Sequence, residues 1–244
     1  MTAARTLSHH TLERIRKRFA LSEVCRPDEE AYLPLSSPFG RVGELRLFRG
    51  NDASVRKMVY IGMAVAQFGL DSHMIFAFTA PGSAVPHFTL DSVMNAPDFA
   101  FHLDLIPRLD LGANVEYILS AFTPLDPIYE DASKIEGLKP ARLTPTQYAL
   151  MSPWMLVYRA NESAFEAIQT PVSAYLDHWF SLVERGITPP AGETPESLAE
   201  RDRRNRVAIF NPQIDKVWVQ VERLVGSAMG ETMRQILINQ EVES

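Results

Sequence analysis

The chain has 244 residues, of which 46% are hydrophobic and 22% charged, and its formal net charge is −6. These values are typical of one large globular domain or two small ones, and the acidic balance argues against a nucleic-acid-binding protein. The single cysteine, Cys25, excludes an internal disulfide and any zinc site built on several cysteines.

The N-terminal segment is predicted to form an amphipathic helix over residues 7–20, with Ile15 and Phe19 on one face and basic residues opposite. It lacks the apolar core and cleavage site of a secretory signal. A polar segment with several prolines follows and is expected to be a loop. The longest apolar run, residues 59–70, contains glycine and glutamine and is too short to span a bilayer. We therefore expect a cytoplasmic protein without a membrane segment.

Strand-like runs come next, separated by turns that are typical of hairpins and too short for crossover helices. These runs cover residues 41–48, 57–66, 71–78, 86–94 and 98–106. Only Asn95 to Pro97 separates the last two runs. The sequence therefore predicts an antiparallel sheet of five or six strands.

The second half of the chain has helical patterns. The predicted helices cover residues 113–122, 144–151, 163–183, 194–209 and 213–238. Thr194 and Pro195 supply a cap and a first-turn proline, whereas Pro171 is expected to kink or split its helix. Strands followed by helices predict an α+β fold. Because no composition shift marks a boundary, we interpret residues 1–244 as a single domain.

The fourth strand-like run carries the most informative residue, Asp91, close to Phe88 and Leu90. An ionised carboxylate is costly to bury without a partner, so such a group pairs or takes a proton. A carboxyl group that holds a proton near neutrality is suited to acid catalysis. The alternative is an ordinary aspartate that faces solvent. On the next strand, His102 and Asp104 share one face, and the simplest role of Asp104 is structural.

Common cofactor and metal motifs are absent from the sequence. It contains no glycine-rich phosphate loop, no G-x-S-x-G elbow and no H-E-x-x-H pattern. The adjacent His9 and His10 are interpreted as a surface pair. We therefore expect no tightly bound cofactor and no metal ion, with chemistry that depends on carboxyl groups.

Blocks of sequence in a fixed order and spacing resemble a known family. They include P-H-F-T-L-D at 86–91, H-L-D-L-I-P at 102–107, M-L-V-Y-R at 155–159, Y-L-x-x-W at 175–179 and a weaker block from 201 to 237. Over most of its length, the chain resembles the ferredoxin-dependent bilin reductases, and more closely their relative, red chlorophyll catabolite reductase. The segments 86–91 and 104–110 are the most specific parts of this resemblance.

The resemblance implies a three-layer α/β/α sandwich with a central antiparallel sheet flanked by helices. A linear tetrapyrrole would lie between the sheet and the C-terminal helices. Such enzymes take single electrons from reduced ferredoxin, form a substrate radical and take protons from the pocket. They hold no flavin, nicotinamide or metal of their own. The expected partners of this chain are therefore ferredoxin and biliverdin or a similar tetrapyrrole.

The resemblance also suggests roles for individual residues. Asp91 aligns with the central acid of the family, which protonates the tetrapyrrole, and Asp215 with a second catalytic acid. Arg159 and Lys216 resemble the arginine and lysine that bind the tetrapyrrole propionates. Taken alone, Asp215 is equally well an acid in the first turn of a helix, and the two cations are ordinary surface charges.

Further candidates for substrate binding lie on the strands around the acid. They are His73, Met74, His87 and Phe88. The phycocyanobilin-forming branch has a histidine where this chain has Met74, and Ile61 or a nearby apolar residue replaces its neighbouring glutamate. His73 is one residue out of step, which turns it to the opposite face of the sheet unless a bulge intervenes. His87 shares the strand face of Asp91. The protonation scheme is therefore expected to differ from that branch.

The leading hypothesis is a ferredoxin-dependent oxidoreductase that reduces biliverdin or a close relative at a CH–CH group. One alternative is a reductase of an open-chain chlorophyll catabolite, although those enzymes have glutamate at the position of Asp91. A second is a non-catalytic tetrapyrrole-binding protein, since apolar residues replace two expected polar groups. A relative that acts on an unrelated hydrophobic ligand is a third, because fold does not fix function.

A docking face for ferredoxin should be basic, because ferredoxins are acidic. The candidates are Arg41, Arg46, Arg56 and Lys57 near a sheet edge, or the helix arginines Arg201, Arg203, Arg204 and Arg206. Either set can also be an ordinary solvated surface.

Overall fold

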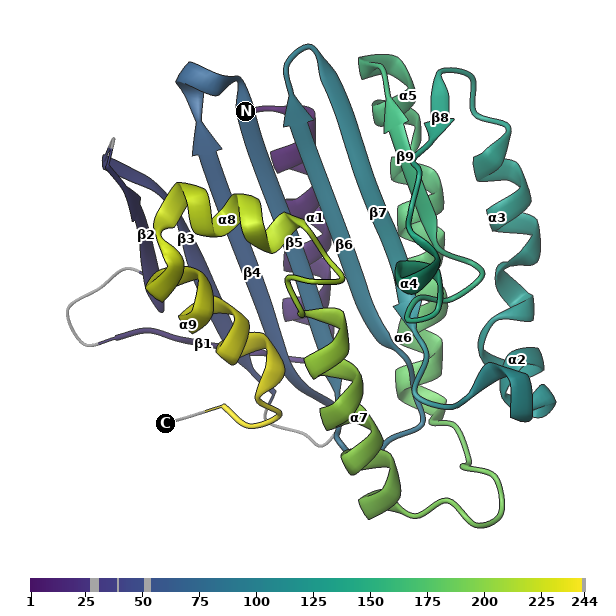
Figure 1. Cartoon of the computed structure of the whole chain (residues 1–244). Coiled ribbons are helices and arrows are strands. Elements are labelled where there is room, and N and C mark those ends of the chain that lie inside the picture. The colour runs from purple at the N-terminus through teal and green to yellow at the C-terminus, as the bar shows by residue number, and fades with distance from the viewer. Residues whose placement is uncertain (27–30, 39, 51–53, 243–244) are drawn as a thin grey trace.

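The computed structural model describes residues 1–26, 31–38, 40–50 and 54–242. Its centre is a nine-stranded antiparallel sheet with the order β1-β3-β4-β5-β6-β7-β9-β8, in which β2 also pairs with β3 (Figure 1). The strands are β1 (Ser22–Val24), β2 (Leu33–Ser37), β3 (Gly40–Arg49), β4 (Val55–Val65), β5 (Leu70–Thr79), β6 (His87–Asn95), β7 (Asp98–Ile106), β8 (Leu138–Pro140) and β9 (Leu156–Ala160).

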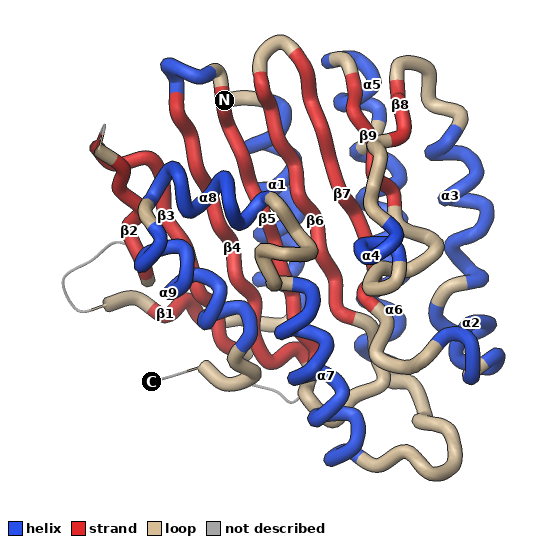
Figure 2. Tube along the Cα trace, viewed as in Figure 1, coloured by secondary structure: helices blue, strands red, loops and turns tan. Residues whose placement is uncertain are grey.

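Helices cover both faces of this sheet (Figures 1 and 2). The helices are α1 (Ala3–Arg18), α2 (Val115–Ala121), α3 (Asp126–Ser133), α4 (Pro145–Tyr148), α5 (Glu162–Ala167), α6 (Gln169–Arg185), α7 (Pro195–Ile209), α8 (Val217–Val225) and α9 (Ser227–Ile238). In Figure 1, α1, α5 and α6 lie behind the sheet, whereas α7, α8 and α9 lie in front of it. These layers confirm the predicted α/β/α sandwich.

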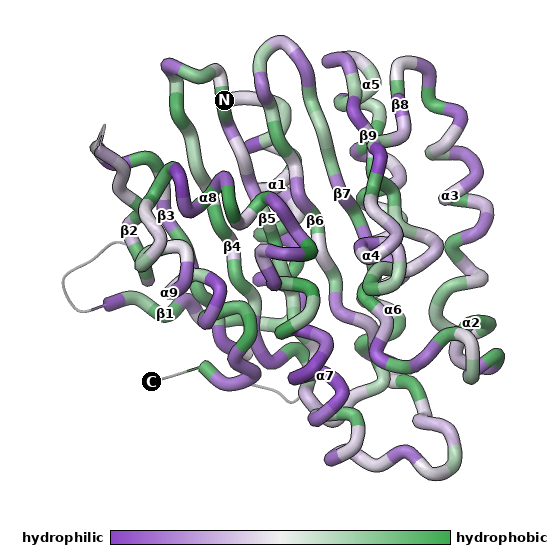
Figure 3. Tube along the Cα trace, in the orientation of Figure 1, coloured by the Kyte–Doolittle hydropathy of each residue, from purple (hydrophilic) through white to green (hydrophobic). Residues whose placement is uncertain are grey.

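Two apolar cores form because successive residues of a strand point to opposite faces. On the rear face, Phe88 of β6 packs against Trp179 of α6, with ring centroids 5.6 Å apart. On the front face, Phe76 of β5 meets Phe210 at the end of α7, at 5.2 Å. In Figure 3 the trace of β4 is mainly hydrophobic and that of α7 mainly hydrophilic.

The predicted strands correspond closely to β3 through β7. The short strands β1, β2, β8 and β9 were not predicted, and β2 forms where a loop was expected. Pro34 is accommodated there because β2 lies at an edge and pairs only with β3.

The helical half agrees with the prediction at one break and differs from it at a second break and one omission. The segment 163–183 is split into α5 and α6 shortly before Pro171, as predicted. The segment 213–238 was expected to be one helix but forms α8 and α9. Gly226 separates them with φ +89°, a conformation that glycine adopts without a Cβ clash. Helix α3 was not predicted.

Among the described residues, no helix is both long enough and apolar enough to cross a membrane.

Candidate functional site

Asp91 lies near the middle of β6, on the face that α7, α8 and α9 cover. In the sheet register it pairs with Met74 of β5 on one side and with His102 of β7 on the other. Its Oδ2 lies 3.7 Å from Nδ1 of His102, and the two side chains are 29% and 19% exposed. The carboxyl group is therefore less desolvated than its apolar sequence suggested, and an acid and an imidazole stand side by side.

Asp215 approaches this pair from the connection between α7 and α8. Burial raises the pKa of Asp215, and the negative charge of Asp91 adds to this effect. Burial is the largest single effect and would lower the pKa of His102, whereas the carboxylate of Asp91 raises it. Asp104 and Asp215 act in the same direction, so the pKa of His102 is raised. The raised pKa values of Asp215 and His102 favour the protonated form of each group, which is the form that a proton donor needs.

These groups border one enclosed cavity of about 30 Å³. Its apolar wall includes Met74, Phe76, Ile106, Met151, Ile209 and Phe210, and its polar groups are Thr89, Asp91, His102, Asp215 and Trp218. Four buried polar atoms here have no hydrogen-bond partner within the described part of the chain: Thr89 Oγ1, Asp91 Oδ1, His102 Nε2 and Trp218 Nε1. Buried polar atoms are normally paired, so several orphans around one cavity indicate a place for a ligand.

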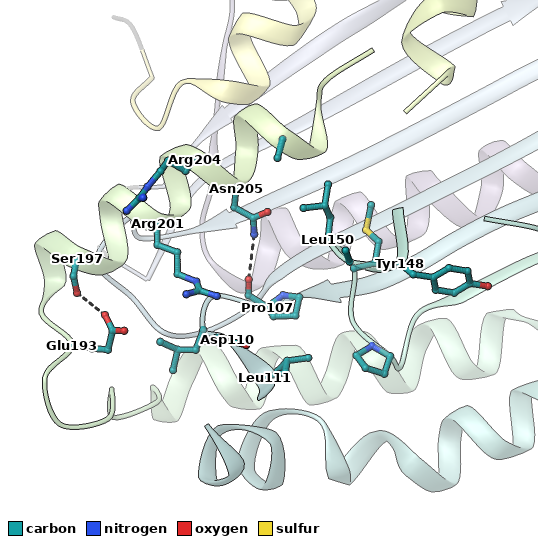
Figure 4. Close-up of a pocket in the computed structure, with 15 residues that line it drawn as sticks. Pro107, Asp110, Leu111, Tyr148, Leu150, Glu193, Ser197, Arg201, Arg204 and Asn205 are labelled. Atoms are coloured by element: carbon teal, nitrogen blue, oxygen red, sulfur yellow. Dashed lines mark hydrogen bonds between the residues drawn. The ribbon is translucent and has the colours of Figure 1, made fainter. Parts of the chain in front are cut away.

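An open cleft of about 690 Å³ adjoins the cavity, and Met151 lines both (Figure 4). One wall is the α7 face with Arg201, Arg204 and Asn205, and the other contains the segment from Tyr148 to Met151. Nε of Arg204 lies 3.3 Å from Oε1 of Glu200. The cleft is large enough for a small organic ligand and has cations at its rim.

Asp104 fixes the chain next to Met151. Its carboxylate is fully buried and accepts hydrogen bonds from the backbone N–H of Ser152 at 2.9 Å and from the Ser152 hydroxyl at 2.5 Å. Burial raises the pKa of Asp104. This arrangement fits the structural role expected for Asp104, and it holds Met151 at the boundary between cleft and cavity.

Two of the predicted substrate-binding residues lie on the face of the sheet opposite Asp91. His73 points to the rear, where Tyr60 and Asp71 bind its ring nitrogens at 2.7 and 2.9 Å. Burial lowers the pKa of His73 to about 4. Phe88 also faces the rear core. The one-residue offset explains His73, since no bulge interrupts the pairing of residues 70–77 with β6. Neither residue is positioned to contact a ligand beside Asp91.

His87 shares the face of Asp91, as expected, but it belongs to a separate buried network. Its Nε2 lies 2.7 Å from Oδ1 of Asp202, and its Nδ1 accepts the backbone N–H of Thr79 at 3.1 Å. Burial lowers the pKa of His87 to about 3. Both ring nitrogens are thus occupied within the protein. Met74, in contrast, does line the cavity opposite Asp91.

The two predicted propionate-binding cations lie outside the cavity. Arg159 is exposed on β9, two residues beyond Val157, which pairs with His102. Lys216 is exposed directly after Asp215, and its Nζ donates to the carbonyl oxygen of Pro212 at 3.2 Å. Either residue can bind a ligand only if that ligand protrudes from the cavity.

Most of the cations considered for docking are neutralised or buried. The pairs are Arg41 with Glu44, Arg46 with Glu23, Arg56 with Glu241, Arg203 and Arg204 with Glu200, and Arg206 with Asp202, while Lys57 is buried. Neither set forms a bare basic patch.

His102 and Trp218 were not identified from the sequence as site residues. The tight turn between β6 and β7 fixes the register of the two strands, and this register could have identified His102 as the neighbour of Asp91. Asn95 pairs with Asp98 across this turn, and counting four residues outward on each strand places Asp91 opposite His102. No comparable local signal exists for Trp218, which reaches the cavity from α8 by tertiary packing. Within the described ranges, no group of three or more His, Cys, Asp or Glu side chains is arranged to hold a metal ion.

The fold and site together define an α/β/α sandwich that places a carboxyl group at the centre of its sheet beneath C-terminal helices. This fold is shared with phytochromobilin synthase from tomato, whose crystal structure was determined in complex with biliverdin. The TM-score is 0.79 at 18% sequence identity, and the match covers 97% of this chain and 83% of that one. No protein-family model matches the sequence, and no curated protein matches it either. At this identity the likeness is one of fold.

Proposed function

We propose that the chain is a bilin reductase, an oxidoreductase that acts on biliverdin or a closely related linear tetrapyrrole. The observation that carries this proposal is the pair of Asp91 and His102 on the central strands, with unpartnered Oδ1 and Nε2 atoms at one cavity. The shared fold with a biliverdin-bound protein supports it. The sequence blocks around Asp91 and Asp104 point to the same family.

The substrate would occupy the cleft and reach past Met151 into the cavity. The cavity of about 30 Å³ is far smaller than the roughly 300–1,000 Å³ of ordinary ligand pockets, whereas the cleft of about 690 Å³ falls within that range. Arg201 stands at the rim of the cleft, where a carboxylate of the substrate would meet it, whereas the neighbouring Arg204 is paired with Glu200. Arg159 and Lys216 would bind a propionate only if it extends out of the cleft and the cavity.

The residues of this chain would supply protons, and ferredoxin would supply electrons one at a time. After the first electron, Asp91 donates a proton to the substrate radical. His102 keeps the carboxyl group in place and shares its proton through the facing Nδ1 and Oδ2 atoms. Asp215, whose pKa is raised by burial, donates the second proton. No flavin, nicotinamide or metal ion bound to this chain is part of this scheme.

A non-catalytic bilin-binding protein is the second candidate, because the apolar Met74 stands opposite Asp91 where a polar partner was expected. The two candidates differ in turnover. The test is an anaerobic absorbance time course with biliverdin, ferredoxin and an enzyme that keeps ferredoxin reduced. A reductase converts biliverdin to a bilin with a new spectrum, and D91N abolishes this conversion but retains binding. D98N is the matched control, because Asp98 is exposed at the start of β7.

The outcomes separate the hypotheses. A stable spectrum of bound biliverdin without turnover favours the binding protein. Conversion of an open-chain chlorophyll catabolite in place of biliverdin identifies the other reductase. No spectral response to either compound contradicts a tetrapyrrole-binding site altogether.

A further inference from the structure

Trp218 differs from the two other tryptophans of the chain. The indole N–H of Trp154 donates to Oδ1 of Asp126 at 2.6 Å, and that of Trp179 donates to the carbonyl oxygen of Pro86 at 2.9 Å. Trp218 is only 1% exposed, yet its Nε1 has no acceptor among the residues that the structure describes. The buried indole of Trp179 and the partly buried indole of Trp154 are therefore satisfied internally, whereas that of Trp218 is not.

The unpartnered N–H belongs to a ring that is firmly held. Trp218 stands in the first turn of α8 and packs edge-on against Phe210, with ring centroids 6.1 Å apart and an interplanar angle of 85°. An indole N–H can only donate a hydrogen bond. Leaving such a donor buried and unpaired is costly, so the site is prepared for an acceptor from outside the protein.

The other orphan atoms at this cavity indicate the chemistry of the missing group. Thr89 is 1% exposed, and its hydroxyl can donate or accept. Oδ1 of Asp91 accepts a hydrogen bond when the carboxyl group is ionised. A ligand that presents a carbonyl oxygen next to an N–H matches a wall that offers both a donor and an acceptor. A lactam is such a group, and linear tetrapyrroles end in lactam rings.

We propose that Trp218 binds the carbonyl oxygen of a terminal lactam of the substrate and thereby places a lactam ring in the cavity. The inference rests on the proposed function, because it takes the substrate to be a linear tetrapyrrole. Trp218 acts as a binding and specificity residue, and the adjacent ring N–H lies toward Asp91. An analogue without the carbonyl leaves the indole unpaired and is discriminated against.

The test compares W218F with W179F. Phenylalanine retains an aromatic ring and removes the N–H in each case. W218F is expected to bind biliverdin about 3- to 10-fold more weakly than the wild type, which corresponds to the loss of one neutral hydrogen bond. W179F retains wild-type affinity but has a lower melting temperature, because it loses an internal hydrogen bond. Circular dichroism confirms that both variants are folded.

A second pair of probes isolates the carbonyl group. A dipyrrinone carries a terminal lactam, and a dipyrrin of the same length lacks it. The wild type is expected to prefer the dipyrrinone, and W218F loses that preference while it binds the dipyrrin as the wild type does. Equal affinity of W218F and wild type for biliverdin and the dipyrrinone overturns the role of Trp218 and leaves the proposed function standing. Failure of the wild type to bind biliverdin overturns both.

Discussion

Asp91 and His102 lie directly opposite each other on β6 and β7, with Oδ2 and Nδ1 3.7 Å apart. The charged groups that surround the imidazole are all acidic. Asp91 faces it from β6, Asp104 lies on its own strand, and Asp215 approaches from the connection that precedes α8. The histidine is therefore biased toward its protonated form and stores a proton beside the central acid.

This relationship predicts the titration of His102. The folded protein holds the pKa of His102 above its ordinary value because the carboxylates of Asp91, Asp104 and Asp215 together outweigh burial. D91N removes the main stabilising charge, so the pKa of His102 should fall. NMR titration of the ring protons measures this shift, and His178 in the rear layer is the internal control. An unchanged pKa of His102 in D91N would show that the two side chains do not interact in solution.

The size of residue 151 is expected to control passage from the cleft to the cavity. M151W fills the junction and should weaken biliverdin binding about 10-fold, which corresponds to about 1.4 kcal/mol. M151A opens the junction and should not weaken binding. A titration followed by absorbance compares both variants with Y148W, which changes only the rim of the cleft. Wild-type affinity of M151W would place the ligand elsewhere.

The buried His87 predicts how stability depends on pH. Its pKa is about 3 in the folded protein and about 6.5 in the unfolded chain, so the unfolded chain binds more protons between these values. The free energy of unfolding should therefore rise with pH across this window by about 1.4 kcal/mol per pH unit from this residue. H87Q should reduce the slope in urea unfolding between pH 4 and 6. T79V, which removes a hydroxyl bound to His87, should lower stability and retain the slope.

The buried Lys57 predicts how the free energy of unfolding depends on pH above neutrality. It is 1% exposed, and its Nζ donates to the carbonyl oxygens of Ile236 and Asn239, near the end of α9. Burial lowers its pKa from 10.5 to about 7. The unfolded chain binds more protons between these values, so this residue makes the wild type more stable as pH rises from 7 to 10.

K57M removes both the titration and the two hydrogen bonds. It should destabilise the protein by about 1–3 kcal/mol, because Ile236 loses the ammonium donor while the carbonyl oxygen of Asn239 keeps Arg206, and it should lose the rise above pH 7. Chemical unfolding at pH 7, 8 and 9 measures both effects. K134M on the surface is the control, because Lys134 pairs only with Asp131 in solvent. Equal pH dependence of K57M and the wild type would contradict the assignment.

The central strands were predictable because local signals agree there. Alternating side chains and tight turns give β7 the predicted bounds, Asp98 to Ile106. Strand β9 was missed because its partner β7 lies far away in the sequence and no hairpin turn connects the two strands. The break between α8 and α9 depends on the backbone conformation of Gly226, which the helical pattern around it conceals.

The site was only partly predictable for the same reason. Asp91 stood out because a carboxyl group within an apolar strand conflicts with its surroundings. Asp215 reaches the same cavity, but its approach depends on how α7 and α8 pack on the sheet. His87 and His73 followed from strand parity, yet parity alone does not show that other side chains already occupy their nitrogens. Such satisfaction is a property of tertiary structure.

The site is divided between two parts of the fold, because the sheet contributes Thr89, Asp91 and His102, whereas the C-terminal layer contributes Asp215 and Trp218. A ligand that contacts both parts binds only the docked arrangement, so its apparent affinity is reduced by the fraction of molecules in which the layer is open. Conversely, ligand binding raises the free energy of opening of α8 and α9. Hydrogen exchange in these two helices thus measures how much of the site is occupied by ligand, even though the central acid lies on a strand of the sheet.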